Sequence, residues 1–231
     1  MTPAELRAQL EEDLAWRLDE LRHLRNTLLG TREQKDWPVS SMRTILVMQY
    51  AHLEGFAQNA FSLYIRAIND QCISAKDIHP NLFACALVKE FDAVRLGAGN
   101  DQETEDGRLM RRARHQVDFV QKMRSLSEQI LSIDAEAVVS MEMNFGSDVL
   151  RRTLYRLGIP DGTVSKSHFT SLEFVRVARN DIAHGSRKER IEPGLFEAHR
   201  RKCEQFMDDL SRLITHAVDS EWYKADKIAS A

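Results

Sequence analysis

The amino-acid sequence predicts an all-α fold, on three observations. Good helix formers such as Leu, Ala, Glu and Arg dominate its 231 residues, whereas glycine (10) and proline (5) are few. Apolar residues recur at every third or fourth position along several long segments, as they do on one face of an amphipathic helix. Capping residues and glycines stand at the expected ends of these segments. Together these features indicate a bundle of amphipathic helices.

The overall composition is that of a globular domain. With 43% hydrophobic and 29% charged residues, the chain has enough apolar material for a real core. Its net charge of −3 gives no overall sign of nucleic-acid binding, so an anion site has to come from local clusters. No apolar run approaches 18 residues, and the N-terminus carries acids but no apolar signal segment. We therefore expect a cytoplasmic protein with no membrane partner.

Cysteine and histidine spacing gives no sign of a metal site. Cys72, Cys85 and Cys203 are an odd number at wide spacings without a CxxC pair, which argues against a disulfide framework and a zinc knuckle. Cys85 and Cys203 fall in apolar helical patterns and are expected to be buried. The histidines lack HExxH spacing, and GxxxxGK[ST] and GxGxxG are absent. We therefore expect no metal and no cofactor.

The first predicted helix spans residues 4–29 and carries a stripe of leucines. Gly30 follows as a stop signal. The stripe fits either a coiled-coil seam that binds an antitoxin or effector partner, or packing against the rest of the domain. Its members recur every three or four positions: Leu6, Leu10, Leu14, Leu18, Leu21, Leu24 and Leu28.

Three further segments follow before residue 128. Residues 41–69 form a second helix with a broad apolar face. Pro80 opens a third helix, whose apolar residues continue as far as Val94 and lead into the acidic loop GAGNDQETEDG. A basic helix is expected over 108–127. Residues 128–146 fit either a short strand or an irregular connection.

Helix signals return after this ambiguous stretch. The segment SDVLRRTLYRLGI reads as a short helix capped by Ser147 and closed by Gly158. Thr170 and Glu173 have the spacing of a capping box and are expected to open the next helix.

The last helix begins near Pro193 and continues to about residue 218. The chain is thus divided into an N-terminal helix and loop (1–36), a helical domain (37–220) and a C-terminal tail (221–231).

The segment VARNDIAHGSR, residues 177–187, places polar groups at the end of a helix. Asn180 and His184 are four residues apart and share one face, and Arg179 lies beside them. Gly185 would let the chain leave the helix in a left-handed conformation, and the helix dipole would favour protonated His184. An arginine beside a tunable histidine suits an anion that needs proton transfer, such as a phosphodiester. The alternative is a capping and salt-bridge cluster at a helix end.

This segment resembles the signature of the HEPN superfamily, which comprises α-helical domains of prokaryotic toxins, defence systems and RNA-processing factors. Its motif is Arg, often followed by Asn, and then His after four to six residues; here these are Arg179, Asn180 and His184. The helix LVMQYAHLEGFAQNAFSLYI and the connector FGSDVLRRTLYRLGI are similar to those of MAE_28990-type HEPN proteins and their RiboL-PSP relatives. The resemblance covers roughly residues 40–218. It implies a HEPN-like bundle to which the N-terminal helix is added.

The resemblance implies a metal-independent endoribonuclease with a composite cleft between two protomers. His184 would act as general base or acid for attack by the RNA 2′-hydroxyl, leaving a 2′,3′-cyclic phosphate. Arg179 would bind the scissile phosphate and Asn180 would orient the site. Glu54 would hold Arg179 or His184 in place, with Asp181 as a second supporting residue. The alternative for Glu54 is an ordinary surface or helix-pair carboxylate.

The basic cluster RKER follows the motif, and its Arg187, Lys188 and Arg190 would lead the RNA backbone into the cleft. A solvated helix face is the alternative for this cluster, and it is the interpretation of the other basic clusters, at 111–115, 151–152 and 199–202. In HEPN toxins that a nucleotidyltransferase antitoxin silences, a tyrosine stands two positions after the histidine. Here that position is Ser186, so adenylylation of such a tyrosine is not supported.

Two function classes follow from these observations. The first is a ribonuclease in a toxin–antitoxin or phage-defence setting, acting as a homodimer on RNA and regulated by an antitoxin or another protein. The second is a non-catalytic HEPN relative that binds RNA, a nucleotide or a partner protein. The presence of Arg179, Asn180 and His184 together favours the enzyme.

Overall fold

The computed structural model describes residues 1–96, 104–126, 129–139, 144–185 and 191–230. Within these ranges the regular structure is helical, and β-pairing is limited to two isolated bridges. The predicted all-α fold is confirmed. In the same ranges, no helix has both the length and the apolar character needed to cross a membrane.

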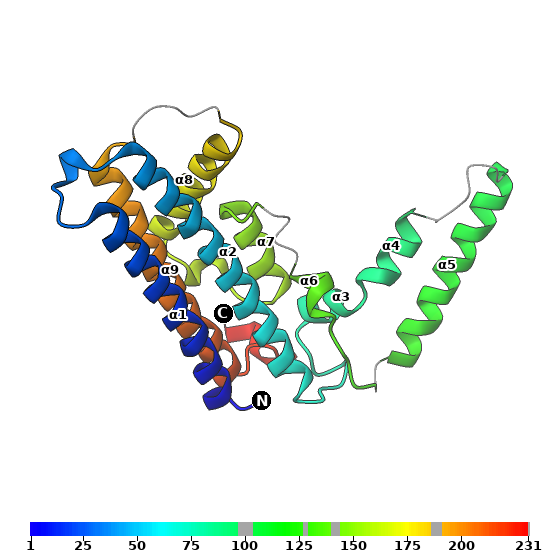
Figure 1. Cartoon of the computed structure of the whole chain (residues 1–231). Helices are drawn as coiled ribbons and strands as arrows, with labels where there is room; N and C mark the ends of the chain where they lie inside the picture. The colour runs from blue at the N-terminus through cyan, green and yellow to red at the C-terminus, as the bar shows by residue number, and fades with distance from the viewer. Residues whose placement is uncertain (97–103, 127–128, 140–143, 186–190, 231) are drawn as a thin grey trace.

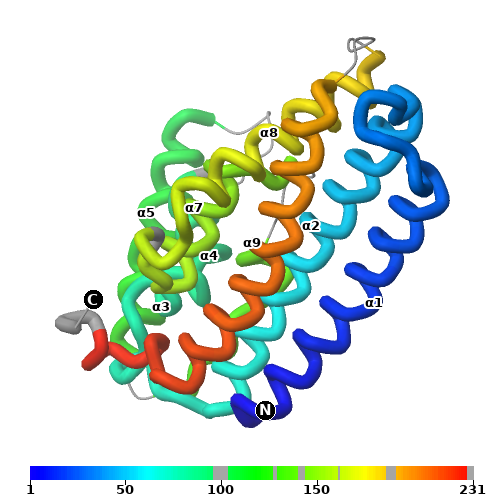
Figure 2. The backbone as a smooth tube through the Cα atoms, turned by 90° about the vertical axis from the view of Figure 1, so that its left-hand side faces the viewer, coloured from blue at the N-terminus to red at the C-terminus, as the bar shows by residue number. Residues whose placement is uncertain are grey.

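Three long helices form the body of the molecule. α1 (Pro3–Leu29), α2 (Val39–Asn69) and α9 (Pro193–Asp219) lie side by side, as Figures 1 and 2 show from two directions. α8 (Lys166–Ala183) packs against both α2 and α9. α2 is therefore the central helix of the core, and its buried face includes Tyr50, Phe56 and Phe61.

The leucine stripe of α1 packs against its own domain. Its members at positions 6, 10, 14 and 21 are buried, and those at 18, 24 and 28 are half-buried against the same core. The stripe is therefore covered by α2 and α9, and the coiled-coil interpretation does not hold. The helix itself starts as a capping box, in which the Thr2 hydroxyl accepts from the Glu5 amide at 3.2 Å and Glu5 accepts from the Thr2 amide at 2.8 Å.

The expected third helix is broken in two. α3 (Pro80–Ala86) ends at Leu87, and α4 (Val88–Leu96) starts directly after it. The break separates two packing partners, because α3 packs against α7 (Ser147–Arg156) whereas α4 packs against α5 (Glu105–Leu126).

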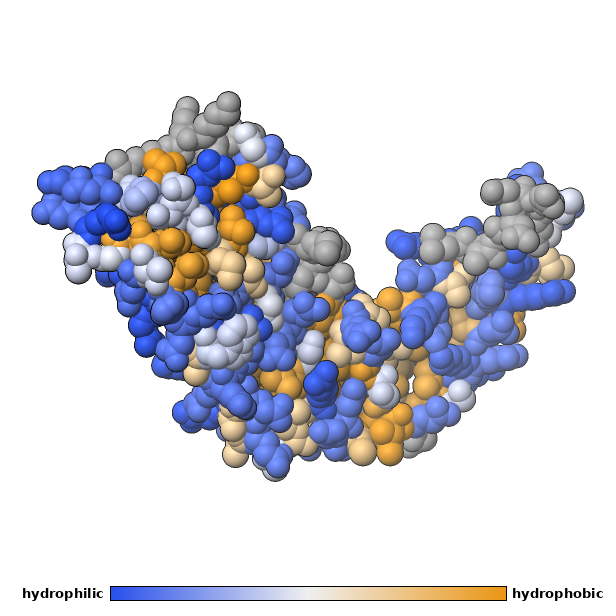
Figure 3. Space-filling view, viewed as in Figure 1, coloured by the Kyte–Doolittle hydropathy of each residue, from blue (hydrophilic) through white to orange (hydrophobic). Residues whose placement is uncertain are grey.

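α4 and α5 form a hairpin that projects from the body as an arm (Figure 1). The rings of Phe91 and Phe119 lie 5.5 Å apart between the two helices. A wide concavity opens between this arm and the body (Figure 3). α5 leaves four large apolar side chains exposed: Leu109, Met110, Val117 and Val120.

The ambiguous stretch from 128 to 146 contains one short helix, α6 (Ala135–Val138), capped by Asp134. Before it, the side chain of Asn69 exchanges two 2.9 Å hydrogen bonds with the backbone of Ile133, which holds this segment against the end of α2. Residues 140–143 lie outside the described part of the chain.

Two predicted caps are wrong. α7 (Ser147–Arg156) has Gly146 as its N-cap, so Ser147 is the first helical residue. α8 starts at Lys166, because Ser165 is extended and its hydroxyl accepts from the His168 amide at 3.3 Å. Thr170 therefore lies inside the helix, where its hydroxyl donates to the Lys166 carbonyl.

The segment predicted as a C-terminal tail packs into the fold. Tyr223 is buried, and its carbonyl accepts from the His79 amide at 2.7 Å. The Ala225 amide donates to the Asp77 carbonyl, and Ile78 forms a bridge with Lys224. This pairing fixes the segment beside the start of α3. Cys85 and Cys203 are buried, as predicted.

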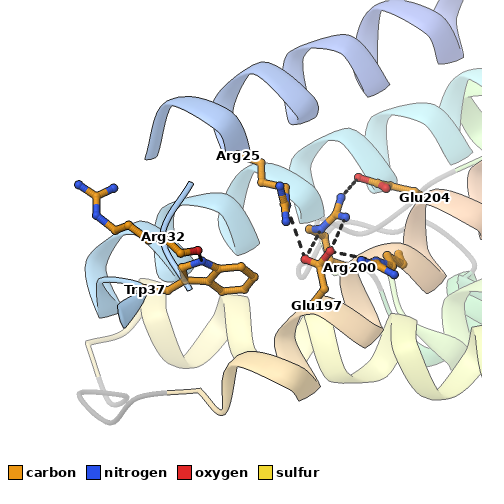
Figure 4. A network of polar contacts seen from close by, with 7 residues as sticks. Arg25, Arg32, Trp37, Glu197, Arg200 and Glu204 are labelled. Atoms are coloured by element: carbon orange, nitrogen blue, oxygen red, sulfur yellow. Dashed lines mark hydrogen bonds and ion pairs between the residues drawn. The ribbon is translucent and has the colours of Figure 1, made fainter. Parts of the chain in front are cut away.

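A network of ion pairs joins α1 to α9 (Figure 4). The carboxylate of Glu197 accepts from Arg200 Nε and from Arg201 Nε, each at 2.9 Å, and Arg25 Nε lies 3.7 Å away. Arg200 also donates to Glu204. Burial alone would raise the pKa of Glu197, yet the hydrogen bonds and charges of these arginines lower it to about 2.

Gly158 provides a test of backbone geometry, because it has φ +69° and a Cβ there would lie 2.9 Å from His79 Nδ1. We expect Gly158→Ala to lower the free energy of unfolding by about 2 kcal/mol or more, through left-handed strain and this close contact. Gly185→Ala is the matched control, since Gly185 has the same φ and a Cβ there would have no atom of the described residues within 4 Å. Urea denaturation should show the smaller loss for Gly185→Ala; equal losses would rule out the contact with His79.

Candidate active site

The C-terminal end of α8 presents the polar motif at the surface. Ala178 is buried on the core side, whereas Asn180 is half-buried and His184 is exposed. The His184 amide donates to the Asn180 carbonyl at 2.9 Å as the last helical bond, and Gly185 leaves the helix with φ +69°. The expected left-handed glycine is confirmed.

Arg179 is held between two neighbours. Its Nη1 donates to Asn180 Oδ1 at 2.9 Å. Its guanidinium carbon lies 4.7 Å from the ring centroid of Tyr50, on α2, in a cation–π contact. Among the described residues, the guanidinium is thus oriented by an aromatic face and one hydrogen bond, and its other N–H groups are left for an anion.

Glu54 reaches Arg179 through Tyr50. The Tyr50 hydroxyl donates to Glu54 Oε1 at 3.0 Å, and the Phe145 amide donates to the same oxygen at 3.3 Å. Burial, followed by the charge of Glu54, raises the pKa of Tyr50, so its hydroxyl stays protonated as a donor. Glu54 is therefore linked to the motif through Tyr50. It accepts a hydrogen bond from the Tyr50 hydroxyl, and the Tyr50 ring contacts the guanidinium of Arg179.

Two residues that the sequence did not single out, Asn144 and Arg176, complete the cluster. Asn144 Oδ1 accepts from Asn180 Nδ2 and from Arg176 Nη1, both at 3.2 Å. Arg176 also donates to Glu173, at 3.1 Å from Nε and 2.5 Å from Nη2. These bonds raise the pKa of Arg176 and lower that of Glu173. A second cation is therefore fixed one helical turn before Asn180.

Helical spacing could have revealed Arg176, because positions 176, 180 and 184 follow one another at intervals of four along a single face. No such signal exists for Asn144, which comes from the connection before α7. That connection runs close to α8: a Cβ on Gly146 would lie 2.5 Å from Arg176 Cδ. Glycine is thus needed where the connection crosses the Arg176 side chain.

His184 stands apart from this network. Its side chain is exposed, and no hydrogen bond joins its ring to another residue in the described part of the chain. Asp181, predicted as a supporting residue, is half-buried beside Asn180 on α8. The predicted RNA-binding residues, Arg187, Lys188 and Arg190, lie outside the described residues. A single protomer thus fixes Arg179 and Asn180 and leaves the imidazole open to solvent.

The role of Glu54 can be tested with two substitutions. Glu54→Gln keeps an oxygen for Tyr50 and Phe145, so we expect stability close to that of the wild type. Glu54→Leu leaves two part-buried donors unsatisfied and should lower the free energy of unfolding by about 1–3 kcal/mol. Thermal or urea unfolding of both variants measures the difference. Equal destabilisation by both would mean that the charge of Glu54, rather than its acceptor oxygen, is what the site needs.

A comparison with protein families bears directly on this arrangement. The model of the MAE_28990-like HEPN family matches residues 6–223 of the chain. The chain belongs to this HEPN family. The match includes α1, so the N-terminal helix lies within the matched region rather than ahead of it. No curated protein and no solved structure shows a significant match to the chain.

Proposed function

We propose that this HEPN protein is an endoribonuclease that cleaves RNA through attack of a 2′-hydroxyl. The observation that carries the proposal is the cluster at the end of α8. There Arg179 is oriented by Asn180 and Tyr50, Arg176 supplies a second cation, and His184 follows one turn later on the same face as Asn180. Two fixed guanidinium groups beside an exposed imidazole suit a phosphodiester that exchanges protons as it reacts.

The proposed reaction is an internal transesterification. The 2′-oxygen attacks the adjacent phosphorus, the bond from phosphorus to the 5′-oxygen breaks, and a 2′,3′-cyclic phosphate and a 5′-hydroxyl end result. One group accepts the proton of the 2′-hydroxyl, and one donates a proton to the leaving 5′-oxygen. Arg179 stabilises the negative charge that develops on the non-bridging oxygens. Asn180 holds Arg179 in the orientation this requires.

The need for both a base and an acid supports a dimeric site. In the described part of the cluster, His184 is the one imidazole, and its ring faces solvent. A homodimer that brings two copies of His184 together would supply one ring as base and the other as acid. The proposal therefore includes a homodimer with a shared cleft, which a light-scattering mass of two chains would support and a monomer mass would oppose.

The test is incubation of the purified protein with a mixed RNA pool in EDTA, followed by analysis of product ends. We expect the wild type to leave 2′,3′-cyclic phosphate ends and Arg179→Ala to lose about 10²-fold or more of the rate. Arg22→Ala, at an exposed position on α1, is the control and should cleave like the wild type. Equal cleavage by Arg179→Ala and the wild type would overturn the assignment to this site.

A toxin–antitoxin or phage-defence setting, with an antitoxin or another regulatory protein as partner, is part of the proposal on the strength of the family resemblance. The alternative is a HEPN module that binds RNA, a nucleotide or a protein without cleaving. RNA binding that depends on Arg179, in the absence of any cleavage, would favour that alternative.

A further inference from the structure

α5 carries a row of exposed side chains with the spacing of a coiled-coil seam. Met110, Val117 and Val120 are 59%, 55% and 49% exposed, and Ala113 between them is exposed as well. The steps between these positions are three, four and three residues. Alternating steps of this kind place side chains on one narrow stripe of a helix, at the a and d positions of a heptad. α5 therefore presents a seam, formed by these four residues, to solvent.

α4 packs against a different side of α5. Half-buried positions of α5 recur every four residues from 111 to 123, and the ring of Phe119 in this row faces Phe91 of α4. His115, in the middle of the row, lies about half a turn of helix from the middle of the seam. α4 also lies between α5 and the body in Figure 1. The hairpin thus covers one side of α5 and leaves the seam on the side away from α4.

The two ends of the seam carry opposite charges. Asp106 lies four residues before Met110, and Arg124 lies four residues after Val120, so both continue the same stripe. Both side chains are exposed. From Asp106 to Arg124 the stripe is about 27 Å long, at 1.5 Å per residue. It therefore runs from an acid, through apolar side chains, to a base.

This stripe is complementary to a second copy of itself that runs in the opposite direction. A two-fold axis between two identical helices makes every contact occur twice, once in each direction. When the axis passes beside residue 115, positions equally far before and after that residue face each other. The seam residues then meet other seam residues, and each acidic end meets a basic end. Three pairs result: Met110 with Val120, Ala113 with Val117, and Asp106 with Arg124.

The charges favour the antiparallel arrangement over a parallel one. In a parallel pair identical positions meet, so Asp106 would face Asp106 and Arg124 would face Arg124, and both ends would repel. Arg112 and Arg114 lie at the edges of the stripe, where long side chains can keep their charge in water while their stems cover apolar surface. The pattern therefore fits one occupant, an antiparallel second copy of α5.

We propose that two copies of this protein associate through their arms, with the two α5 seams packed antiparallel across a two-fold axis. Asp106 of each copy pairs with Arg124 of the other, and the exposed apolar side chains are covered. The inference goes beyond the proposed function, because none of the candidate active-site residues lies on α5. The contact is short, so we expect association in the micromolar range, as for small interfaces.

Sedimentation velocity of the full-length protein, from about 1 to 100 µM, measures this association. Val117→Glu places two carboxylates in the apolar centre of the contact and should raise the dissociation constant about 100-fold or more. Asp106→Arg brings two cations together at each end and should raise it about tenfold or more. Adding Arg124→Asp to Asp106→Arg restores both ion pairs in reverse, so the double variant should associate like the wild type.

Asp118→Arg is the control, because it makes the same charge change at an exposed position of α5 outside the seam. Circular dichroism checks that each variant is folded. If Val117→Glu and Asp106→Arg associate like Asp118→Arg, the arm contact is overturned, even when another surface forms a dimer. A double variant as weak as Asp106→Arg would overturn the antiparallel pairing.

Two further outcomes separate this contact from RNA. A wild type that stays monomeric at the highest of these concentrations, but binds an RNA strand through Arg124, would overturn the second copy as the occupant of the seam. If the arm variants weaken association as expected while the wild type never cleaves RNA, the arm contact stands and the ribonuclease proposal fails.

Discussion

Replacing His184 with alanine is expected to lower the rate of RNA cleavage by about 10²- to 10⁴-fold while the helical fold is kept. An imidazole can both accept and donate a proton during the reaction, which the guanidinium of Arg179 and the amide of Asn180 do not do. The side chain of His184 is exposed and lies at the end of α8, so its loss removes little packing. His184→Ala should therefore lower the rate of cleavage and leave the free energy of unfolding nearly unchanged.

Two measurements separate these effects. Single-turnover cleavage of a defined RNA gives the rate, and binding of its 2′-O-methyl form gives the affinity, which should change little in His184→Ala. His23→Ala is the control, since His23 is an exposed histidine on α1. A variant that lacks His184 and still cleaves at the wild-type rate would exclude the histidine from the reaction.

Glu197→Gln is expected to lower the free energy of unfolding by about 3 kcal/mol at pH 7. The Glu197 side chain is 6% exposed and receives hydrogen bonds from Arg200 and Arg201, with Arg25 of α1 close by (Figure 4). Removing its charge leaves Arg200, which is 11% exposed, with Glu204 as its remaining carboxylate partner. Glu197→Gln should lower the free energy of unfolding for two reasons. The positive charge of the arginines is no longer compensated, and α1 and α9 are joined less strongly.

This stabilisation should depend on pH in a defined direction. The pKa of Glu197 is about 2 in the folded protein and near 4.5 in the unfolded chain. A carboxylate with a depressed pKa stabilises the fold above its unfolded pKa, and that stability is lost as the pH falls through the folded value. The difference between wild type and Glu197→Gln should thus be full above about pH 5 and shrink towards pH 2.

Urea unfolding of the two proteins between pH 7 and pH 3 gives this difference directly. Glu204 contributes in the opposite direction, because burial raises its pKa, and since the charge of Glu197 adds to that rise, part of this contribution remains in the difference. Glu11→Gln is the control, because its pair with Arg7 is exposed to solvent and should contribute little to stability. A difference that stayed constant over this pH range would show that the charge of Glu197 does not stabilise the fold.

Helix position and type were predictable because they depend on local patterns. The leucine spacing of α1, the glycine after His184 and the Glu192–Pro193 start of α9 each act within a few residues of one another. The start of α8 was predicted wrongly because two local signals competed there. Ser165 and Thr170 are both capping residues, and the extended backbone at Ser165 decided which one caps α8.

The all-α class and the shared face of Asn180 and His184 follow from the sequence, because periods of three and four residues express both, and the family motif is a short run within one helix. Tertiary structure alone decided that Tyr50 supports Arg179 and that Asn144 joins Asn180 to Arg176. It also decided that Arg151 and Tyr155 share a cavity with Trp222. These groups come from helices and loops far apart in the chain, and no local spacing encodes which distant segments pack together.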